Sequence, residues 1–409
     1  MGAPAVKGLA GRLPAAALAL ASGLAACLVT AGTAAGDTVR DNEWALAALQ
    51  VPQAWMTTRG EGVTVAVLDS GVDAGHPDLS GQVTAGPDLA GGDAKPGDPF
   101  WGQHGTAMAS TIAGHGHGAG SGAGVIGVAP AAKLLSVRVT WDNNDPIRNL
   151  PAGQRSAAGA RSGDPVADGI RYAVDHGAQV INMSFGEAAN AAAGVSGTAD
   201  AVQYAIAHGV VLVASTGNGA QTSNVAEVPA ALPGVIAVAA TDRAGRRATF
   251  STHQWTTSVA APGVEVIEAQ AGGGYLVGDG TSPAAALVSG VAALIRSRYP
   301  KLTPAQVRDV LQRTATRSSS GYSEDVGWGI VQAAAALRLA ATLVPDAMAP
   351  RPAPGRSRLL GDGAVPRVGL RAINGPALAG PLGLVAGGGV LLVTAVLLLT
   401  VGRRRAGAG

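Results

Sequence analysis

Short apolar runs, rich in valine, recur along the middle of the chain. They cover residues 63–68, 133–139, 179–183, 210–214 and 235–239. Continuous apolar runs of this length are typical of strands that are buried on both faces. Each run therefore predicts a core strand rather than a strand with one face in solvent.

Two stretches between these runs have the apolar spacing of helices. Residues 165–175 carry apolar side chains four positions apart, and residues 199–208 form the second stretch. Gly177 and Gly209 follow the two stretches, where a C-cap glycine belongs. Alternating strands and helices predict an α/β fold, with a mostly parallel central sheet and helices on both of its faces.

Two further segments have a recognisable local signal. Thr303 precedes Pro304, and Gln306 completes a capping box, so a helix is expected to begin here. Residues 140–164 are polar and irregular, which predicts a long surface loop. Such a loop either shapes access to a site or acts as a spacer.

The N-terminus has the pattern of a signal peptide over residues 1–36. Lys7 and Arg12 precede an apolar stretch, and small residues then offer a cleavage site before Asp37. Two other interpretations remain open, namely an uncleaved membrane helix and lipidation at Cys27, which ends a sequence resembling a lipoprotein box.

The C-terminus carries the second membrane signal. Residues 377–401 are apolar and uncharged, and about 20 such residues span a bilayer. Three arginines follow in the tail, residues 402–409, so the positive-inside rule places the tail in the cytoplasm. Residues 345–376 are rich in proline and arginine, which predicts an extended linker. We therefore expect a cell-membrane protein whose body, residues 61–344, lies outside.

Charge and cysteine content exclude several classes of function. The chain has 29 basic and 27 acidic residues, so nothing indicates a nucleic-acid partner. Cys27 is the single cysteine, which leaves the body without disulfide or thiolate chemistry. No Cys/His cluster has zinc spacing, and we expect neither a metal site nor a cofactor. His115 and His117, in a glycine-rich stretch, are interpreted as structural, and His76 as a turn residue.

Asp69 comes directly after the first apolar run, at the carboxyl end of a predicted strand. This is where α/β folds place active sites, and Gly71 permits a tight turn there. A carboxylate in this position can accept the Nδ1–H of a histidine, which fixes the tautomer and stabilises the imidazolium. The same strand–Asp–Ser–Gly pattern occurs in other hydrolases, so it predicts this chemistry only together with further motifs.

Two such motifs follow. His104 begins a segment of small residues typical of a closely packed helix, and it can serve as general base and then as acid. Ser282 begins an apolar helix reaching about residue 297, whose N-terminus favours developing negative charge at an oxyanion. Taken singly, each also fits a structural role, a helix-start histidine and an N-cap serine.

Asn218 offers an oxyanion donor. It follows the apolar run at 210–214, and its side-chain amide can act beside the Ser282 backbone N–H. The alternative is an ordinary Asn-Gly turn.

Together these motifs resemble those of the subtilisin-like serine proteases, over about residues 63–337. The chain order of aspartate, histidine and serine is the order in subtilisin. Further motifs in family order lie at 127–130, 181–186, 228–230, 260–263 and 327–329. The resemblance implies a three-layer subtilisin-like fold, a cis-proline in 228–230, and a serine endopeptidase with Asp69, His104 and Ser282 as its triad.

The resemblance also implies where a protein or peptide substrate binds. The family's cleft segments correspond to Ser184, Phe185, Gly186, Ser215, Thr216 and Gly217.

A narrower resemblance concerns the flanking segments. Residues 39–44 and 54–55, with the linker, the predicted span and the arginine tail, are similar to the mycosins, membrane-anchored subtilases of actinobacterial type VII secretion. This implies that residues 37–60 wrap onto the body and are not a large inhibitory propeptide. It also implies a secretion complex as partner, either with exported proteins as substrates or with a structural role in which catalysis is weak or dispensable.

Three residues depart from the family pattern. Pro283 follows the serine where a large apolar residue is usual, Ala286 replaces a proline, and Gln103 stands where glycine is usual. Because a residue before proline is biased to extended conformations, Pro283 predicts a restricted Ser282. None of the three changes deletes a catalytic group.

Overall fold

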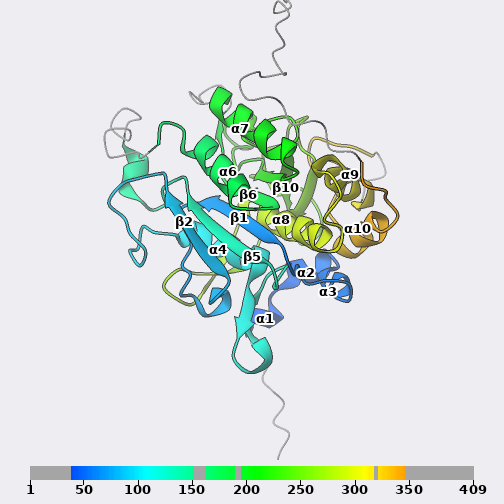
Figure 1. Cartoon of the computed structure of the whole chain (residues 1–409), viewed down its shortest axis with the longest axis horizontal. Coiled ribbons are helices and arrows are strands. Elements are labelled where there is room, and N and C mark those ends of the chain that lie inside the picture. Colours follow the sequence, from blue (N-terminus) through cyan, green and yellow to red (C-terminus); the bar gives the residue numbers. More distant parts are fainter. Residues whose placement is uncertain (1–37, 151–161, 189–194, 317–320, 347–409) are drawn as a thin grey trace, which may run out of the picture. The chain divides into compact units, whose positions relative to one another are not determined.

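A seven-stranded parallel sheet forms the centre of the protein. The computed structural model describes residues 38–150, 162–188, 195–316 and 321–346 (Figure 1). The strands are β1 (Thr64–Asp69), β2 (Val83–Asp88), β5 (Lys133–Arg138), β6 (Val180–Met183), β8 (Val211–Ser215), β10 (Ile236–Thr241) and β11 (Val259–Pro262). Their order is β11-β10-β8-β6-β1-β5-β2, and all neighbours are parallel. The five predicted strands are confirmed, with ends shifted by one or two residues.

Helices cover both faces of the sheet. Helices α6 (Pro165–Asp175) and α7 (Val195–Ala207) lie on one face, and α4 (Gln103–Ala113) and α8 (Thr281–Arg298) lie on the other (Figure 1). Alternate residues of β1 serve the two layers, because Val65 and Val67 belong to one core while Ala66 and Leu68 belong to the other. This explains the continuous apolar runs and confirms the predicted three-layer α/β fold.

The two predicted helix-end signals are present. Gly177 and Gly209 have φ of +79° just past α6 and α7, a conformation that glycine adopts without strain. Helix α9 (Pro304–Thr314) begins with the capping box of Thr303 and Gln306. Helix α10 (Ala333–Ala340) follows it and packs against α9 and α8.

The N-terminal segment packs onto the body, as the mycosin resemblance implies. It forms α1 (Thr38–Asp41), α2 (Trp44–Ala48) and α3 (Val51–Ala54). Leu49 and Val51 are fully buried in the core shared with α4 and α8. The Trp55 indole donates to the Val128 carbonyl at 2.8 Å, which attaches α3 to the loop before β5.

Three small two-stranded antiparallel sheets and three 3-10 turns complete the described fold. The pairs are β3 (His115–His117) with β4 (Ala123–Ile126), β7 (Glu187–Ala188) with β9 (Glu227–Val228), and β12 (Val266–Ala269) with β13 (Tyr275–Gly278). The turns are η1 (Pro77–Leu79), η2 (Ala119–Ser121) and η3 (Pro146–Asn149). The Val228–Pro229 peptide is cis, as the family resemblance implies.

The prediction of an irregular surface loop over 140–164 is wrong for its first part. Residues 146–149 form η3, and Asp142 and Asp145 are buried. Asp145 caps η3 at the Ile147 N–H, and the Asp145-Pro146 pair was a local sign of this turn. Asp142 bonds to the distant start of α4, which the sequence could not show.

The predicted leader, the linker beyond Asp346, the span and the tail lie outside the described residues. Within the ranges that the structure describes, no helix combines the length and apolar character needed to cross a bilayer.

Candidate active site

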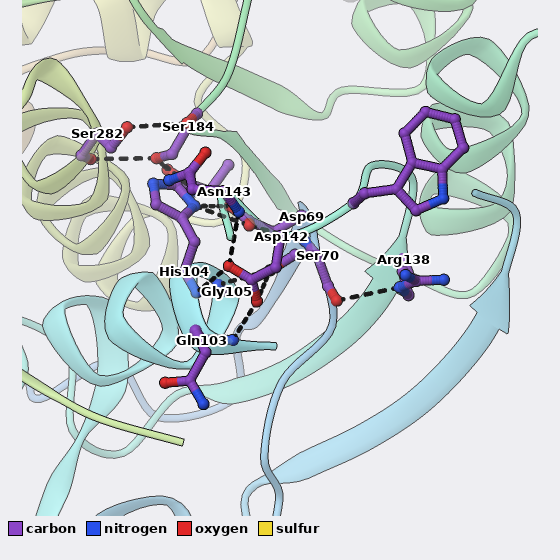
Figure 2. Close-up of polar contacts among 12 residues, drawn as sticks. Asp69, Ser70, Gln103, His104, Gly105, Arg138, Asp142, Asn143, Ser184 and Ser282 are labelled. Atoms are coloured by element: carbon purple, nitrogen blue, oxygen red, sulfur yellow. Dashed lines mark hydrogen bonds and ion pairs between the residues drawn. The ribbon is translucent and has the colours of Figure 1, made fainter. Parts of the chain in front are cut away.

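Asp69 ends β1, the strand between β5 and β6 in the sheet. Its side chain is 1% exposed, and Oδ1 accepts the Ser70 N–H at 2.7 Å. Arg138 pairs with it in register, and Arg138 Nε donates to the Ser70 carbonyl at 3.2 Å (Figure 2). The turn after β1 is thereby held from the neighbouring strand, which fixes the carboxylate at the carboxyl edge of the sheet.

His104 is the second residue of α4 and contacts Asp69 directly. Its Nδ1 lies 2.8 Å from Oδ1 and 3.0 Å from Oδ2 of Asp69 (Figure 2). An ionised carboxylate can only accept here, so Nδ1 carries a proton, and in the neutral imidazole Nε2 has the lone pair. A Cβ on Gly105 would overlap the Gly71 carbonyl oxygen, so glycine at 105 lets α4 approach the turn after β1.

Asp142 caps the helix that carries His104. The N-cap residue, Gly102, has no side chain, and Asp142 accepts the N–H groups of Gln103 and His104 instead, the latter at 3.2 Å. The Ser70 hydroxyl also donates to it at 3.1 Å. Asp142 is 2% exposed, yet an aspartate in a polar stretch gave no signal of this role in the sequence.

Ser282 is the second residue of α8. Its Oγ donates to the Ser184 carbonyl at 2.9 Å, and the Ser184 hydroxyl donates to the Ser282 carbonyl at 3.1 Å (Figure 2). No hydrogen bond between Ser282 and His104 occurs in the described part of the chain. The Ser282 hydroxyl must give up its bond to the Ser184 carbonyl before it can donate to His104. Catalytic hydrogen bonds are often long or poorly aligned without substrate.

The expectation that Pro283 holds Ser282 extended is wrong. Ser282 lies within α8, which begins at Thr281, so Pro283 is the third helical residue. Proline is tolerated in the first turn because its missing N–H had no helical acceptor there, and the bias on the preceding residue is a preference that the packed helix overrides. Pro283 is itself buried in this turn.

Asn218 follows β8 and contacts the start of α8. Its Oδ1 accepts the Thr281 N–H at 2.9 Å and the Thr281 hydroxyl at 3.0 Å. Both bonds require the oxygen on this side, so the amide Nδ2 is left as a donor without a partner in the described residues. The Ser282 N–H lies in the first turn of α8, where no helical acceptor exists. These two donors fit an oxyanion hole.

A cleft of about 750 Å³ joins these groups. Its walls include Asp69, His104, Asn218 and Ser282, and five of the six predicted substrate-binding residues: Ser184, Phe185, Gly186, Ser215 and Gly217. Thr216 does not line it. That side chain is buried and its hydroxyl donates to the Val238 carbonyl at 3.2 Å, away from the cleft.

Acidic groups dominate the electrostatics around His104. Burial of the ring lowers the pKa of His104, but the charge and hydrogen bond of Asp69, with smaller contributions from Glu268 and Asp142, outweigh this and raise it to about 9. Glu268, on β12, is 3% exposed and lines the same cleft. Burial raises the pKa of Glu268 to about 7, and the positive charge of His104 partly opposes that rise.

Glu268 and Glu227 are two further cleft carboxylates that sequence reasoning missed. Both lie on short strands, and although Glu227 directly precedes the family motif at 228–230, no local pattern places either side chain in the cleft. His117, which is interpreted from the sequence as structural, has its Nδ1 2.6 Å from the buried carboxylate of Asp78. His76, which is interpreted from the sequence as a turn residue, also caps the 3-10 turn η1. Within the described ranges, no group of three or more possible ligands could hold a metal ion.

The pH profile should show the effect of Glu268 on His104. A general base must be neutral, so kcat/KM should rise with pH as the His104 imidazolium, whose pKa is about 9, loses its proton. Glu268→Gln removes a negative charge that favours the imidazolium, so the rising limb should move to lower pH, with Asp69 and Asp142 still acting on the ring. The pH dependence of kcat/KM for peptide cleavage measures this.

Glu265→Gln is the matched control for that experiment. Glu265 precedes the same strand, but its carboxylate is 60% exposed and pairs with Arg243 at 2.9 Å. The Glu265→Gln variant should therefore leave the pH dependence of kcat/KM unchanged. If Glu268→Gln also left the limb unchanged, the charge of Glu268 would not act on His104.

Known proteins similar to this chain share its fold. The model of the subtilase family matches residues 60–329. Fervidolysin from Fervidobacterium pennivorans is 38% identical over 330 residues, which are 74% of this chain and 44% of fervidolysin. Subtilisin from Bacillus pumilus is 37% identical over 278 residues, 68% of this chain and 92% of that protein. The chain thus spans less than half the length of fervidolysin but nearly all of the subtilisin.

Among solved structures, the MycP3 protease from the type VII (ESX-3) secretion system is also similar. It is 30% identical, with a TM-score of 0.58, and the match covers 72% of this chain and 87% of MycP3.

Proposed function

Because this chain belongs to the subtilase family of serine endopeptidases, we propose that it hydrolyses peptide bonds with Asp69, His104 and Ser282 as its catalytic triad. The observation that carries the proposal is the bond from His104 Nδ1 to Asp69, at 2.8 Å, in a cleft that Ser282 also lines. This arrangement leaves Nε2 as the basic nitrogen, which is the tautomer that a general base toward serine needs.

In the proposed reaction the Ser282 hydroxyl turns from the Ser184 carbonyl toward His104 Nε2. Its Oγ attacks the peptide carbonyl carbon while Nε2 takes the proton. The Ser282 N–H and Asn218 Nδ2 stabilise the oxyanion, and Asp69 remains ionised and stabilises the imidazolium. His104 then protonates the leaving amine, and water hydrolyses the acyl-enzyme by the reverse sequence of proton transfers.

A fluorophosphonate probe tests whether Ser282 is activated. The full-length chain, purified in detergent, should be labelled covalently, and Ser282→Ala should not be. Ser289, a buried serine of the same helix, supplies the control Ser289→Ala, which should still be labelled. A folded wild-type chain that resists the probe would count against the catalytic proposal.

We also propose that the protease acts at the cell membrane. The support is the sequence of residues 377–401 with its arginine tail, together with the leader. The likeness to MycP3, described as part of a type VII system, favours a secretion complex as the partner.

A structural role in that complex is the second candidate function. It is favoured by the Ser282 hydroxyl, which is bonded to Ser184 rather than to His104. Secretion in cells that lack the native chain separates the two. If catalysis is needed, Ser282→Ala should fail to restore export. If the role is structural, Ser282→Ala should restore export and a chain without residues 377–401 should not.

A further inference from the structure

A carboxylate closes the space between two segments of the cleft. Strands β6 and β8 are neighbours in the sheet. The segment that follows β6 contains Gly186, and the segment that follows β8 contains Gly217. Glu227, on β9, extends its side chain to both. A Cβ on Gly217 would overlap Oε1 of Glu227, and a Cβ on Gly186 would overlap Oε2. Glycine at both positions therefore leaves just the room that this carboxylate occupies.

Glu227 has no partner for its charge among the residues that the structure describes. No hydrogen bond or ion pair to its carboxylate occurs within the described residues, although the side chain is half-buried and lines the cleft. Burial alone raises the pKa of Glu227 to about 7, because no cation lies near enough to offset it. Arg148 also lines the cleft, but its guanidinium is exposed and donates to the Trp141 carbonyl. Within the described residues, Glu227 is thus available to pair with a cationic group of the substrate.

The position of Glu227 relative to the reacting groups identifies which part of a substrate it meets. Asn218 directly follows Gly217 in one segment. In the other segment, Ser184 lies two residues before Gly186. The hydroxyl of Ser184 donates to the Ser282 carbonyl, and the Ser282 hydroxyl donates to the Ser184 carbonyl. A carbonyl attacked by Ser282, with its oxygen toward Asn218, belongs to a residue that lies between these two segments. The side chain of that same residue enters the space that Glu227 closes.

We propose that Glu227 makes this chain select peptides in which lysine or arginine supplies the attacked carbonyl, an inference that rests on the proposed function. A charge-assisted hydrogen bond in a half-buried site is among the stronger polar contacts that proteins make. A neutral side chain in the same place would leave Glu227 desolvated, without a partner and partly protonated. Asp142 and Glu268 cannot substitute for it, since Asp142 bonds to the start of α4 and both carboxylates act on His104.

Arginine and citrulline provide the test, because they have the same shape and differ in charge. Peptide libraries, randomised elsewhere, carry one or the other at the residue before the cleaved bond. The wild-type full-length chain should cleave the arginine library with a kcat/KM about 10²-fold higher. Glu227→Gln should bring the ratio near one. Glu187→Gln, an exposed change on the paired strand β7, should keep the wild-type ratio.

Labelling by the fluorophosphonate probe separates the two proposals. The probe needs an activated Ser282 but no side chain in this part of the cleft. A wild-type chain that is labelled, yet cleaves the arginine and citrulline libraries equally, overturns the role of Glu227 alone. A folded wild-type chain that is neither labelled by the probe nor active on either library would contradict the proposed function, and this inference would fall with it. The wild-type ratio decides the matter even if Glu227→Gln fails to fold.

Discussion

Ser282→Ala should lower kcat for peptide hydrolysis by about 10⁶-fold, the magnitude found when the serine of subtilisin is removed. Without the hydroxyl, no acyl-enzyme can form, and water must attack the bound peptide directly. The fold should persist, since the change removes one hydroxyl whose bond is to the Ser184 carbonyl. Steady-state cleavage of a peptide library, with circular dichroism as the check on folding, measures the effect.

The double variant with His104→Ala makes this prediction specific to a triad. Serine and histidine act as a unit, so each single change should cost about as much as both together. A double variant that is slower than Ser282→Ala by a further large factor would mean that His104 acts independently of the serine. Activity surviving Ser282→Ala would assign the nucleophile to another group in the cleft.

The residues of the triad could be predicted because each sits at a local signal. Asp69 follows a run that is apolar on both faces, and such a run is a central strand of a parallel sheet. His104 and Ser282 each stand at the second position of a helix with small or apolar residues after it. Strand ends and helix starts are encoded within a few residues, so sequence reveals them.

The supporting carboxylates could not be predicted, because their burial depends on distant parts of the chain. Asp142, Glu227 and Glu268 lie in a polar stretch or on short strands, where an acidic residue ordinarily faces solvent. Asp142 is buried where it accepts N–H groups at the start of α4, 38 and 39 residues earlier in the chain. Glu268 is buried where β12 packs against α4.

Thr216 differs from its neighbours because its side chain has a partner in the core. Ser215 and Gly217 line the cleft, whereas the Thr216 hydroxyl donates to the Val238 carbonyl on β10. Strand β8 ends at Ser215, so no strand periodicity continues through Thr216 that the sequence could have revealed. The family resemblance assigned the whole segment to the cleft, and only the tertiary contacts distinguish its individual residues.

Asp69→Asn should lower kcat by about 10⁴-fold while leaving the cleft intact, the loss known for this change in a serine protease triad. An asparagine amide can donate to Nδ1, which favours the tautomer with its proton on Nε2 and leaves no base toward Ser282. The largest influence raising the pKa of His104 is also lost, so any residual activity should show its rising limb well below pH 9. The pH dependence of kcat/KM in the variant measures both effects.

Asp142→Asn is the matched comparison, because it makes the same change on a buried carboxylate near the same histidine. Asp142 accepts backbone N–H groups at the start of α4 and makes no bond to the imidazole. Both oxygens of Asp142 accept hydrogen bonds, and in Asp142→Asn an amide NH2 replaces one of them and leaves donors unpaired. The free energy of unfolding should therefore fall by about 1–3 kcal/mol, with a far smaller loss of kcat. Equal losses of kcat in the two variants would mean that Asp69 serves mainly to hold α4 in place. A large difference would mean that the Asp69 carboxylate acts through the tautomer and charge of His104, which is the role that a triad requires.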